Sequence, residues 1–410
     1  MTYQQSKEMI KIEELKYEFE KCRVCGECLS HCPVFGFTKD EAAGEMEKLR
    51  SGRPSKVLSW CTGCMACNNF CELDCKPYQL ILDRHHRNYL ERGGLPAMIE
   101  SILFYSRPNI AGEVAKRFTS REKADAEKWL KAAEKPESLK GEKELLFLGC
   151  NQFLNPYVVA SGLWAELPAF GKPGELCCGE PLYRLGVLDA VARQTQRLNH
   201  YFSGFEIERL VMFCPAGYNM FNNVLPQKFG LRLPFKTVYL GDWLLEKIDR
   251  GEIERKKKLD LKITVHDSCH SRQLGADFRD SNRRLLEWTG AEIVEMRRHG
   301  DQGLCCGLAA AAGFYPNTVP SLFKALAEAD RTNADALAAY CNGCVVTLMI
   351  GRRFFPGKPV HHAFDLVRMA AGEEPPYLHK KRGLDLVMAS LGLFRKQGLS
   401  LVTRPRRKIM

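Results

Sequence analysis

Two cysteine runs with the same spacing constrain this chain more than any other feature. The first run is Cys22, Cys25, Cys28 and Cys32, spaced C-x2-C-x2-C-x3-C and followed by Pro33. The second run repeats the spacing with Cys61, Cys64, Cys67 and Cys71. The two-residue steps let one short loop wrap three thiolates around three corners of a cube-shaped centre, with the fourth cysteine offset. The sequence therefore indicates a segment that folds around inorganic centres.

These runs are typical of bacterial 4Fe–4S ferredoxins, in which the fourth cysteine ligates the other cluster. We therefore expect crossed ligation of two cubane clusters. The first cluster would be held by Cys22, Cys25, Cys28 and Cys71, and the second by Cys61, Cys64, Cys67 and Cys32. Glu72 rather than proline follows Cys71, whereas Cys75 precedes Lys76-Pro77. Either Cys71 or Cys75 can be the fourth ligand, and the spacing favours Cys71.

Zinc is the alternative metal for these thiols. Zinc knuckles use C-x2-C pairs separated by longer gaps, not triple runs of cysteine. A zinc-structured scaffold or interaction protein is therefore the less favoured interpretation.

The length of the chain and the distribution of its apolar residues indicate the cellular compartment in which these thiols are found. The chain has 410 residues, enough for two or three domains, and 18 cysteines. The first twenty residues lack an apolar signal region, so we expect the thiols to stay reduced in the cytoplasm. Since no stretch approaches the ~20 apolar residues of a membrane span, we expect no crossing of the bilayer by this sequence.

The net charge of +11 is partly concentrated near the C-terminus. Leu384, Leu386, Val387, Leu391, Leu393 and Phe394 lie among these basic residues and predict an amphipathic helix. The charge is either that of a solvated tail or a docking surface for an anionic membrane face or an acidic partner. No recognition motif for nucleic acid accompanies it, so we expect no nucleic-acid partner.

The residue pattern of the C-terminal part is typical of an α/β region. Short apolar runs predict strands at Leu145–Leu148, Leu210–Phe213, Val238–Leu240, Ile263–His266 and Ile293–Met296. Helical patterns separate them, as at Leu182–Phe202 and Val319–Ala339. Strands that alternate with helices favour a largely parallel sheet.

This region also repeats a cysteine pattern. The second copy is complete and consists of Cys269, Cys305, Cys306, Cys341 and Cys344. Its five soft thiolates are one more than a cubane needs, which suggests an iron–sulfur cluster of unusual shape. The first copy has only Cys150, Cys177, Cys178 and Cys214, because Gly217 stands where the fifth cysteine is expected. Four thiolates suffice for a cubane, so this copy either holds a further cluster, holds a modified cluster or leaves the pocket vacant.

Three polar residues flank Cys269. His266, Asp267 and His270 are either satisfied structural groups, donors to the metal ligands, or a route for protons beside a redox centre. The structural interpretation is the more common one.

Each copy of the repeat contains a Cys-Cys-Gly step, Cys177-Cys178-Gly179 or Cys305-Cys306-Gly307, which we call the CCG motif. The predicted fold class is a mainly α ferredoxin-type N-terminal domain binding two clusters, followed by an α/β region of two similar CCG lobes. The expected boundaries are 1–95 for the ferredoxin-type domain, 96–143 for a helical linker, 144–255 for the first lobe, 256–372 for the second lobe and 373–410 for a basic amphipathic tail.

The combination of a twin ferredoxin run and two CCG repeats resembles the D subunit of heterodisulfide reductase. It is also similar in layout to the iron–sulfur subunits of anaerobic glycerol-3-phosphate dehydrogenase and glycolate oxidase. The resemblance implies a noncubane 4Fe–4S cluster on the five cysteines of the second copy, which would be the point of chemistry. It implies that two cubane clusters relay electrons to or from that centre, with action on a disulfide or thiol as one outcome.

The resemblance also implies partner subunits, such as a membrane cytochrome b or a flavoprotein, and a place at the inner membrane face. No G-x-G-x-x-G follows a predicted strand, so any hydride chemistry would belong to a partner. The alternative function is a pure electron-transfer subunit that links a flavin dehydrogenase or an electron-transfer flavoprotein to a membrane quinone or cytochrome b. The missing cysteine at Gly217 motivates this alternative.

Overall fold

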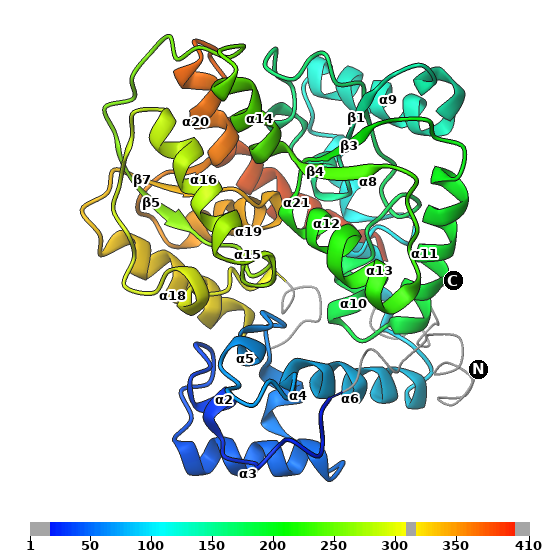
Figure 1. The fold of residues 1–410 in the computed structure, drawn as a ribbon, viewed down its shortest axis with the longest axis vertical. Coiled ribbons are helices and arrows are strands. Elements are labelled where there is room, and N and C mark those ends of the chain that lie inside the picture. The colour runs from blue at the N-terminus through cyan, green and yellow to red at the C-terminus, as the bar shows by residue number, and fades with distance from the viewer. Residues whose placement is uncertain (1–16, 309–316, 398–410) are drawn as a thin grey trace.

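The N-terminal part of the chain is a small helical layer that lies below the rest of the molecule (Figure 1). The computed structural model describes residues 17–308 and 317–397. The helices of this layer are α2 (Glu27–Ser30), α3 (Lys39–Arg50), α4 (Lys56–Trp60), α5 (Ala66–Asn69) and α6 (Pro77–Glu91). Thr38 begins α3 with a capping box, because its side chain accepts from the Glu41 amide while Glu41 accepts from the Thr38 amide.

The two cysteine runs of this layer have the same backbone shape. Val24 and Gly63 occupy the same place in their runs, and both have positive φ, at 55° and 67°. Gly26 and Met65 also correspond, with φ of 78° and 63°. A left-handed conformation costs a residue with a side chain roughly 1–2 kcal/mol. Both runs therefore hold a strained backbone that turns successive cysteines toward one side.

Two four-stranded parallel sheets, together with the helices that cover them, form the larger part of the molecule. The first sheet consists of β1 (Glu144–Phe147), β2 (Ala169–Phe170), β3 (Arg209–Met212) and β4 (Lys236–Tyr239), and the second of β5 (Lys262–His266), β6 (Glu292–Ile293), β7 (Ala336–Ala339) and β8 (Val360–His362). The strand orders are β2-β1-β3-β4 and β6-β5-β7-β8, so the lobes share one topology. The predicted α/β region with two similar lobes is therefore present.

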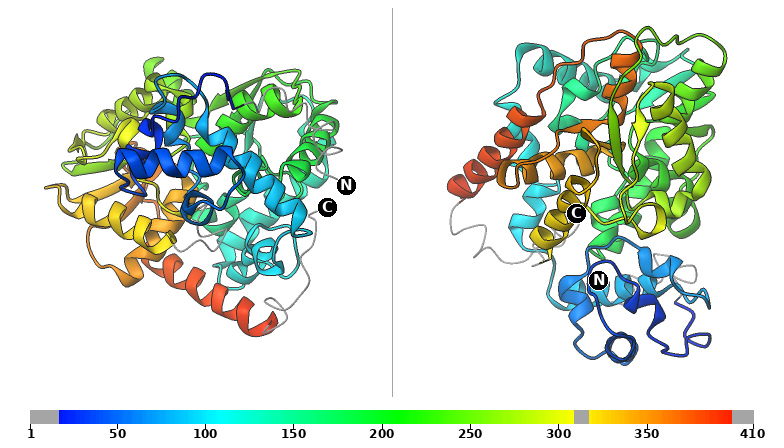
Figure 2. Two further views of the ribbon diagram at one scale, coloured as in Figure 1. Left: turned by 90° about the horizontal axis from the view of Figure 1, so that it is seen from below. Right: turned by 90° about the vertical axis from the view of Figure 1, so that its left-hand side faces the viewer.

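Helices cover these sheets on both sides (Figure 2). In the first lobe they are α10 (Glu180–Arg184), α11 (Leu188–Phe202), α12 (Pro215–Asn219), a π-helical turn (Met220–Val224), α13 (Leu225–Phe229) and α14 (Leu240–Asp249). In the second lobe they are α15 (Ser271–Leu274), α16 (Ala276–Trp288), α18 (Thr318–Asp330), α19 (Asn342–Phe354) and α20 (Ala363–Ala370). The segment between the ferredoxin layer and the sheets contains α7 (Ala97–Ile102), α8 (Ile110–Ala115) and α9 (Ser120–Glu134).

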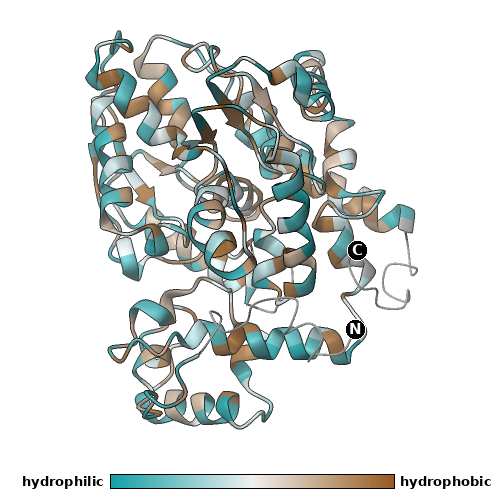
Figure 3. Ribbon diagram, turned by 45° about the vertical axis from the view of Figure 1, so that its right-hand side comes forward, coloured by the Kyte–Doolittle hydropathy of each residue, from teal (hydrophilic) through white to brown (hydrophobic). Residues whose placement is uncertain are grey.

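Beyond their first residues, the inner strands β1, β3, β5 and β7 are buried, because both faces of each sheet are covered there. On β1, Leu145 and Phe147 pack into a core that continues into the ferredoxin layer. Leu146 of the same strand faces a different core, which also contains Ile263 and Val265 of the second sheet. Alternate residues of β1 therefore pack the first lobe against the ferredoxin layer on one side and against the second lobe on the other. The apolar strands are brown in Figure 3.

Two helix predictions were wrong in their extent. The helix predicted over Val319–Ala339 ends at Asp330, and Ala336–Ala339 instead form β7 in the middle of the second sheet. Alanine favours helices, but the pairing of this segment with β5 and β8 overrides that preference. The helix predicted over Leu182–Phe202 is divided into α10 and α11 at Gly186.

The predicted amphipathic segment near the C-terminus forms α21 (His379–Gln397), which packs against α19 and α8. Leu386, Ala389 and Leu393 face inward and are buried. The buried Arg382 pairs with Glu122 of α9. No helix among residues 17–308 and 317–397 is long and apolar enough to cross a membrane.

Gly186 fixes the ferredoxin layer against the first lobe. Its φ is 72°, and its carbonyl lies 2.8 Å from His86 Nδ1 on α6. A Cβ at this position would lie 2.6 Å from the Cβ of His85 and 2.7 Å from the amide nitrogen of His86. The contact therefore requires a residue without a side chain.

We predict that Gly186→Ala destabilises this junction by at least about 1–2 kcal/mol, because the residue needs positive φ and has no space for a methyl group. Thermal unfolding of the anaerobic protein, together with hydrogen exchange of the α6 amides, measures the effect. Gly204→Ala is the control, since a Cβ added there would have nothing within 4 Å. Equal unfolding midpoints and equal exchange in the two variants would contradict the assignment.

Candidate metal centres

The ferredoxin cysteines gather into two sets that cross between the runs. Burial raises the pKa of Cys28, and the charges of Cys71, Cys22 and Cys25 raise it further. These four thiols are therefore neighbours, although Cys71 comes from the second run. The pKa of Cys61 is likewise raised by burial and by Cys64 and Cys32, which places Cys32 of the first run in the second set.

Cys67 lies where the two sets approach each other. Its pKa is raised well above the ordinary value by burial and by charges that include Cys28 of the first set and Cys61 of the second. This is the arrangement that crossed ligation requires. The structure thus brings together the thiols that the spacing predicts as ligands.

Backbone amides point at sulfur in both the ferredoxin runs and the CCG motifs. The Val24 amide lies 3.4 Å from Cys22 Sγ, and the corresponding Gly63 amide lies 3.3 Å from Cys61 Sγ. In the CCG motifs, the Gly179 amide lies 3.4 Å from Cys177 Sγ and the Gly307 amide 3.3 Å from Cys305 Sγ. N–H donors to sulfur stabilise thiolates and tune the potential of iron–sulfur clusters, so these loops fit such a group.

Cys75 lies beside the first set. Its amide lies 3.3 Å from Cys71 Sγ, and its own thiol is 3.8 Å from the carbonyl oxygen of Leu73. Burial and the thiols of Cys71 and Cys22 raise its pKa to about 12. The charge of Cys71 also raises the pKa of Cys28, so Cys71 lies near both Cys28 and Cys75.

The CCG cysteines lie at the carboxyl ends of parallel strands, where α/β sheets commonly bind ligands. Cys150 follows β1, Cys214 follows β3, Cys269 follows β5 and Cys341 follows β7. Cys341 also begins α19, so its sulfur lies at a helix N-terminus, which favours the thiolate.

The five cysteines of the second copy form one buried chain of thiols. Cys269 is within hydrogen-bonding reach of Cys305, and Cys344 joins Cys306 to Cys341. The thiols of Cys305 and Cys344 lower the pKa of Cys306 to about 5. The pKa of Cys341 is lowered as well, whereas the pKa values of Cys269, Cys305 and Cys344 are raised. Five soft sulfur donors gathered at one buried site are suited to binding iron.

The first copy does not keep its four cysteines together in the same way. Cys150 and Cys178 both interact with Cys177 and lower its pKa. Cys214 instead makes its side-chain hydrogen bond with Cys341 of the second copy. The two copies are therefore joined through this pair of sulfurs, an arrangement that the repeat pattern does not predict.

The second ferredoxin set lies directly against the second CCG copy. Cys64, Ala66, Cys269 and Cys305 form one buried cluster, with Phe70 packed against it. The charge of Cys305 also contributes to the raised pKa of Cys61. The thiols thus form a continuous series from the first ferredoxin set to Cys214.

Sequence reasoning missed a buried arginine at this junction. Arg184 of α10 donates to Cys269 Sγ at 2.8 Å and to the Gly63 carbonyl at 2.9 Å. It also pairs with Glu180, which lies 3.0 Å from His270 Nε2. A residue of the first lobe thereby places a positive charge between the second ferredoxin set and the second CCG copy. No local signal distinguishes Arg184 from an ordinary helical arginine.

The three polar residues around Cys269 have different surroundings. Although burial acts to raise it, the pKa of Asp267 is lowered because Arg283 pairs with the carboxylate. The Gly300 amide and the Tyr340 hydroxyl also donate to Asp267, so it is a satisfied structural group. His270 has both ring nitrogens engaged, by Arg184, Glu180 and Asn219.

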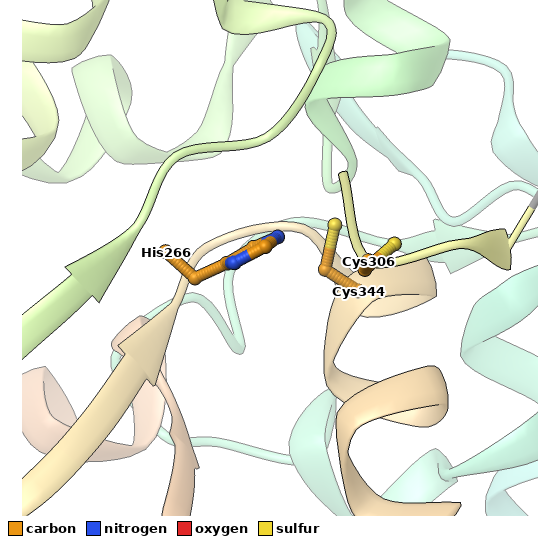
Figure 4. Close-up of side chains that lie close together, drawn as sticks. All are labelled: His266, Cys306 and Cys344. Atoms are coloured by element: carbon orange, nitrogen blue, oxygen red, sulfur yellow. The ribbon is translucent and has the colours of Figure 1, made fainter. Parts of the chain in front are cut away.

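His266 lies among sulfurs. One ring nitrogen of His266 and the Sγ atoms of Cys306 and Cys344 all lie within 4.8 Å of one another (Figure 4). Burial lowers the pKa of His266 to about 4, so its imidazole is neutral at neutral pH.

Known proteins share both parts of this arrangement. Residues 14–72 match the 4Fe-4S dicluster domain family, and residues 263–349 match the Cysteine-rich domain family, known as CCG. The D subunit of the dihydromethanophenazine:CoB–CoM heterodisulfide reductase of Methanosarcina barkeri is 26% identical to the chain, over 82% of this chain and 89% of that protein. Its counterpart from Methanosarcina mazei is also 26% identical, with the same coverage.

The chain is an iron–sulfur protein related to the D subunit of heterodisulfide reductase. Other relatives of this reductase-like protein match shorter parts. The EtfAB:quinone oxidoreductase of Syntrophomonas wolfei is 24% identical over 66% of the chain and 39% of its own length. Lactate utilization protein A of Bacillus licheniformis is 26% identical over 46% of the chain and 82% of its own length. The predicted oxidoreductase and iron–sulfur character is confirmed by these relatives.

For this reductase-like protein we predict that Cys71→Ser lowers the iron content by about four atoms, because it removes a ligand of the first ferredoxin set. Cys75→Ser is the matched control and should keep the iron, since Cys75 lies beside that set. Iron and acid-labile sulfide are measured on anaerobically purified protein. The opposite pattern, with iron lost only from the Cys75 variant, would assign the ligand to Cys75.

Proposed function

We propose that this chain is a redox subunit that relays electrons through two cubane 4Fe–4S clusters to or from a noncubane 4Fe–4S cluster in the second CCG lobe. The first cubane is assigned to Cys22, Cys25, Cys28 and Cys71, and the second to Cys61, Cys64, Cys67 and Cys32. The noncubane cluster is assigned to Cys269, Cys305, Cys306, Cys341 and Cys344. The lobes are taken as residues 144–255 and 256–372.

The contact between the ferredoxin layer and the second lobe carries this proposal. Cys64 shares a buried cluster with Cys269 and Cys305, so the two centres would face each other without a domain in between. Cys67 likewise adjoins the first set through Cys28. Electron relay needs a series of closely spaced centres, and this series supports it.

The outer end of the series is open to a partner. Cys25 of the first set is exposed, whereas Cys28 is buried. We assign electron exchange with a flavoprotein or another redox subunit to this end. The first CCG lobe, with Cys150, Cys177 and Cys178 together and Cys214 against Cys341, is the candidate for a further cluster at the inner end.

When bound, the clusters supply one-electron transfer, and the noncubane cluster supplies a centre for thiol or disulfide exchange. The chain's own residues bury the ligands, direct amides at their sulfurs and place Arg184 beside Cys269. A positive charge at this position favours the more negative, reduced state of a neighbouring cluster.

A pure electron-transfer subunit is the second candidate, and burial of the second CCG copy favours it. All five cysteines of that copy are buried, so a substrate disulfide would need an opening to reach them. The two functions differ in one observable: only a centre that acts on thiols or disulfides changes its electron paramagnetic resonance signal when they are added.

Iron and sulfide stoichiometry tests the proposed clusters. We predict about twelve irons per anaerobically purified chain for two cubanes and one noncubane cluster, and about sixteen if the first lobe also holds one, counting four irons per cluster. Mutation of Cys306 to Ser should remove about four irons and leave the ferredoxin clusters. A colourless protein that contains zinc and no acid-labile sulfide would contradict the proposal and favour the scaffold interpretation.

We further propose peripheral association with an anionic membrane face through α21. Leu384, Met388, Leu391 and Phe394 form an exposed apolar stripe, with 59% of Leu391 and 51% of Phe394 exposed. Exposed Lys380 and Arg395 lie toward the ends of this helix. The sequence beyond α21 adds Arg404, Arg406, Arg407 and Lys408, which lie outside the described residues. An apolar stripe flanked by cations suits the interface of an anionic bilayer.

Vesicle sedimentation tests this association. We predict that the intact protein sediments with phosphatidylglycerol vesicles, that salt weakens the binding, and that neutral vesicles bind less. Leu391→Glu should abolish binding because it places a carboxylate in the middle of the stripe, whereas Ser390→Glu adds the same charge at the edge of the stripe, beside Phe394, and should reduce binding less. Equal binding by both variants, or none by the intact protein, would contradict the membrane assignment.

A further inference from the structure

His266 is buried with one ring nitrogen left without a partner. The residue ends β5 and is 2% exposed, and its Nε2 makes no hydrogen bond among the described residues. An unpaired polar group in a protein interior costs about 1–3 kcal/mol, so such a group calls for an explanation. The sulfurs of Cys306 and Cys344 are the metal-binding atoms that share its surroundings.

The duplication of the lobes provides an internal comparison. His266 lies three residues before Cys269 and pairs with Ala339 on β7, two residues before Cys341. In the first lobe, Phe147 lies three residues before Cys150 and pairs with Met212 on β3, two residues before Cys214. Phe147 is therefore the counterpart of His266.

The first lobe lacks two of the donors that meet around His266. Phe147 replaces the histidine, and it packs against Phe170, Phe202 and Phe221 in an aromatic core. Gly217 stands in the position of Cys344. The histidine and the fifth cysteine are thus present together in one lobe and absent together in the other, which indicates that they belong to one donor set.

We propose that His266 is a nitrogen ligand to an iron of the cluster held by the second CCG lobe, alongside Cys306 and Cys344. The inference rests on the proposed function, because it needs a cluster at these cysteines. A neutral imidazole binds iron, and histidine replaces cysteine at one iron in Rieske centres, where it raises the reduction potential. The second lobe therefore holds six donors, five sulfurs and one nitrogen.

The neighbouring histidine shows why this assignment is specific. His270 lies directly after Cys269 in sequence, but Arg184 and Glu180 engage its Nε2 and Asn219 contacts its Nδ1. His266 Nε2 has no such engagement. Of these two histidines, His266 is therefore the one whose buried ring nitrogen makes no hydrogen bond among the described residues.

Pulsed electron paramagnetic resonance on the anaerobic protein tests the ligation. The sample is the intact chain with histidine labelled by nitrogen-15, and the readout is the nitrogen hyperfine coupling on the signal of the second-lobe cluster. That signal is identified by its loss in Cys306→Ser. We expect the strong coupling of a directly bound nitrogen, replaced by its nitrogen-15 counterpart on labelling.

His266→Phe introduces the residue of the first lobe and should abolish the coupling. His266→Cys is the second variant: it should keep the iron, lose the nitrogen coupling and lower the reduction potential, because a thiolate replaces an imidazole. His270→Asn is the matched control and should keep the coupling.

Three outcomes separate the possibilities. A second-lobe signal with only weak nitrogen coupling, or with a strong coupling that survives in His266→Phe, would overturn the histidine ligand and leave the proposed function intact. The absence of any signal that depends on Cys306 would overturn both. Loss of the strong coupling in His266→Phe and His266→Cys, but not in His270→Asn, supports the ligand.

Discussion

The mutual packing of buried thiols is the constraint on which the rest of this structure depends. Thiolates that share a low-dielectric site repel one another, and burial penalises each charge further. The raised pKa of Cys28 among Cys71, Cys22 and Cys25 shows this repulsion, and that of Cys67 shows it where the sets meet. A bound cation relieves both penalties, so the folded arrangement of these thiols is linked to metal binding.

The backbone is shaped to serve those thiols. Left-handed residues recur at equivalent places in the two ferredoxin runs, and amides point at equivalent sulfurs in the two CCG motifs. In the lobes, parallel strands deliver Cys150, Cys214, Cys269 and Cys341 to the carboxyl edges of the sheets. Arg184 then joins the layers, because one guanidinium contacts the ferredoxin loop at Gly63 and the sulfur of Cys269. A buried positive charge thus lies where the second ferredoxin set meets the second CCG copy.

The sequence was sufficient to predict the iron–sulfur character and the α/β character, because both depend on short-range patterns. Cysteine spacing is local, and the apolar runs at β1, β3 and β5 are strands whose two faces are buried. β7 was missed because Ala336–Ala339 has a helical composition, and only pairing with β5 and β8 makes it a strand. The contact of Cys214 with Cys341, the role of Arg184 and the open nitrogen of His266 depend on long-range packing. A single sequence carries no local signal for any of them.

Magnetic interaction between the centres tests the continuous series most directly. The spin relaxation of the second-lobe cluster is measured by pulsed electron paramagnetic resonance, with the second ferredoxin cluster first oxidised and then reduced. The account predicts faster relaxation when the ferredoxin cluster becomes paramagnetic, because Cys64 and Cys305 place the two centres side by side. Relaxation that is independent of the state of the ferredoxin cluster would contradict the proposed electron path.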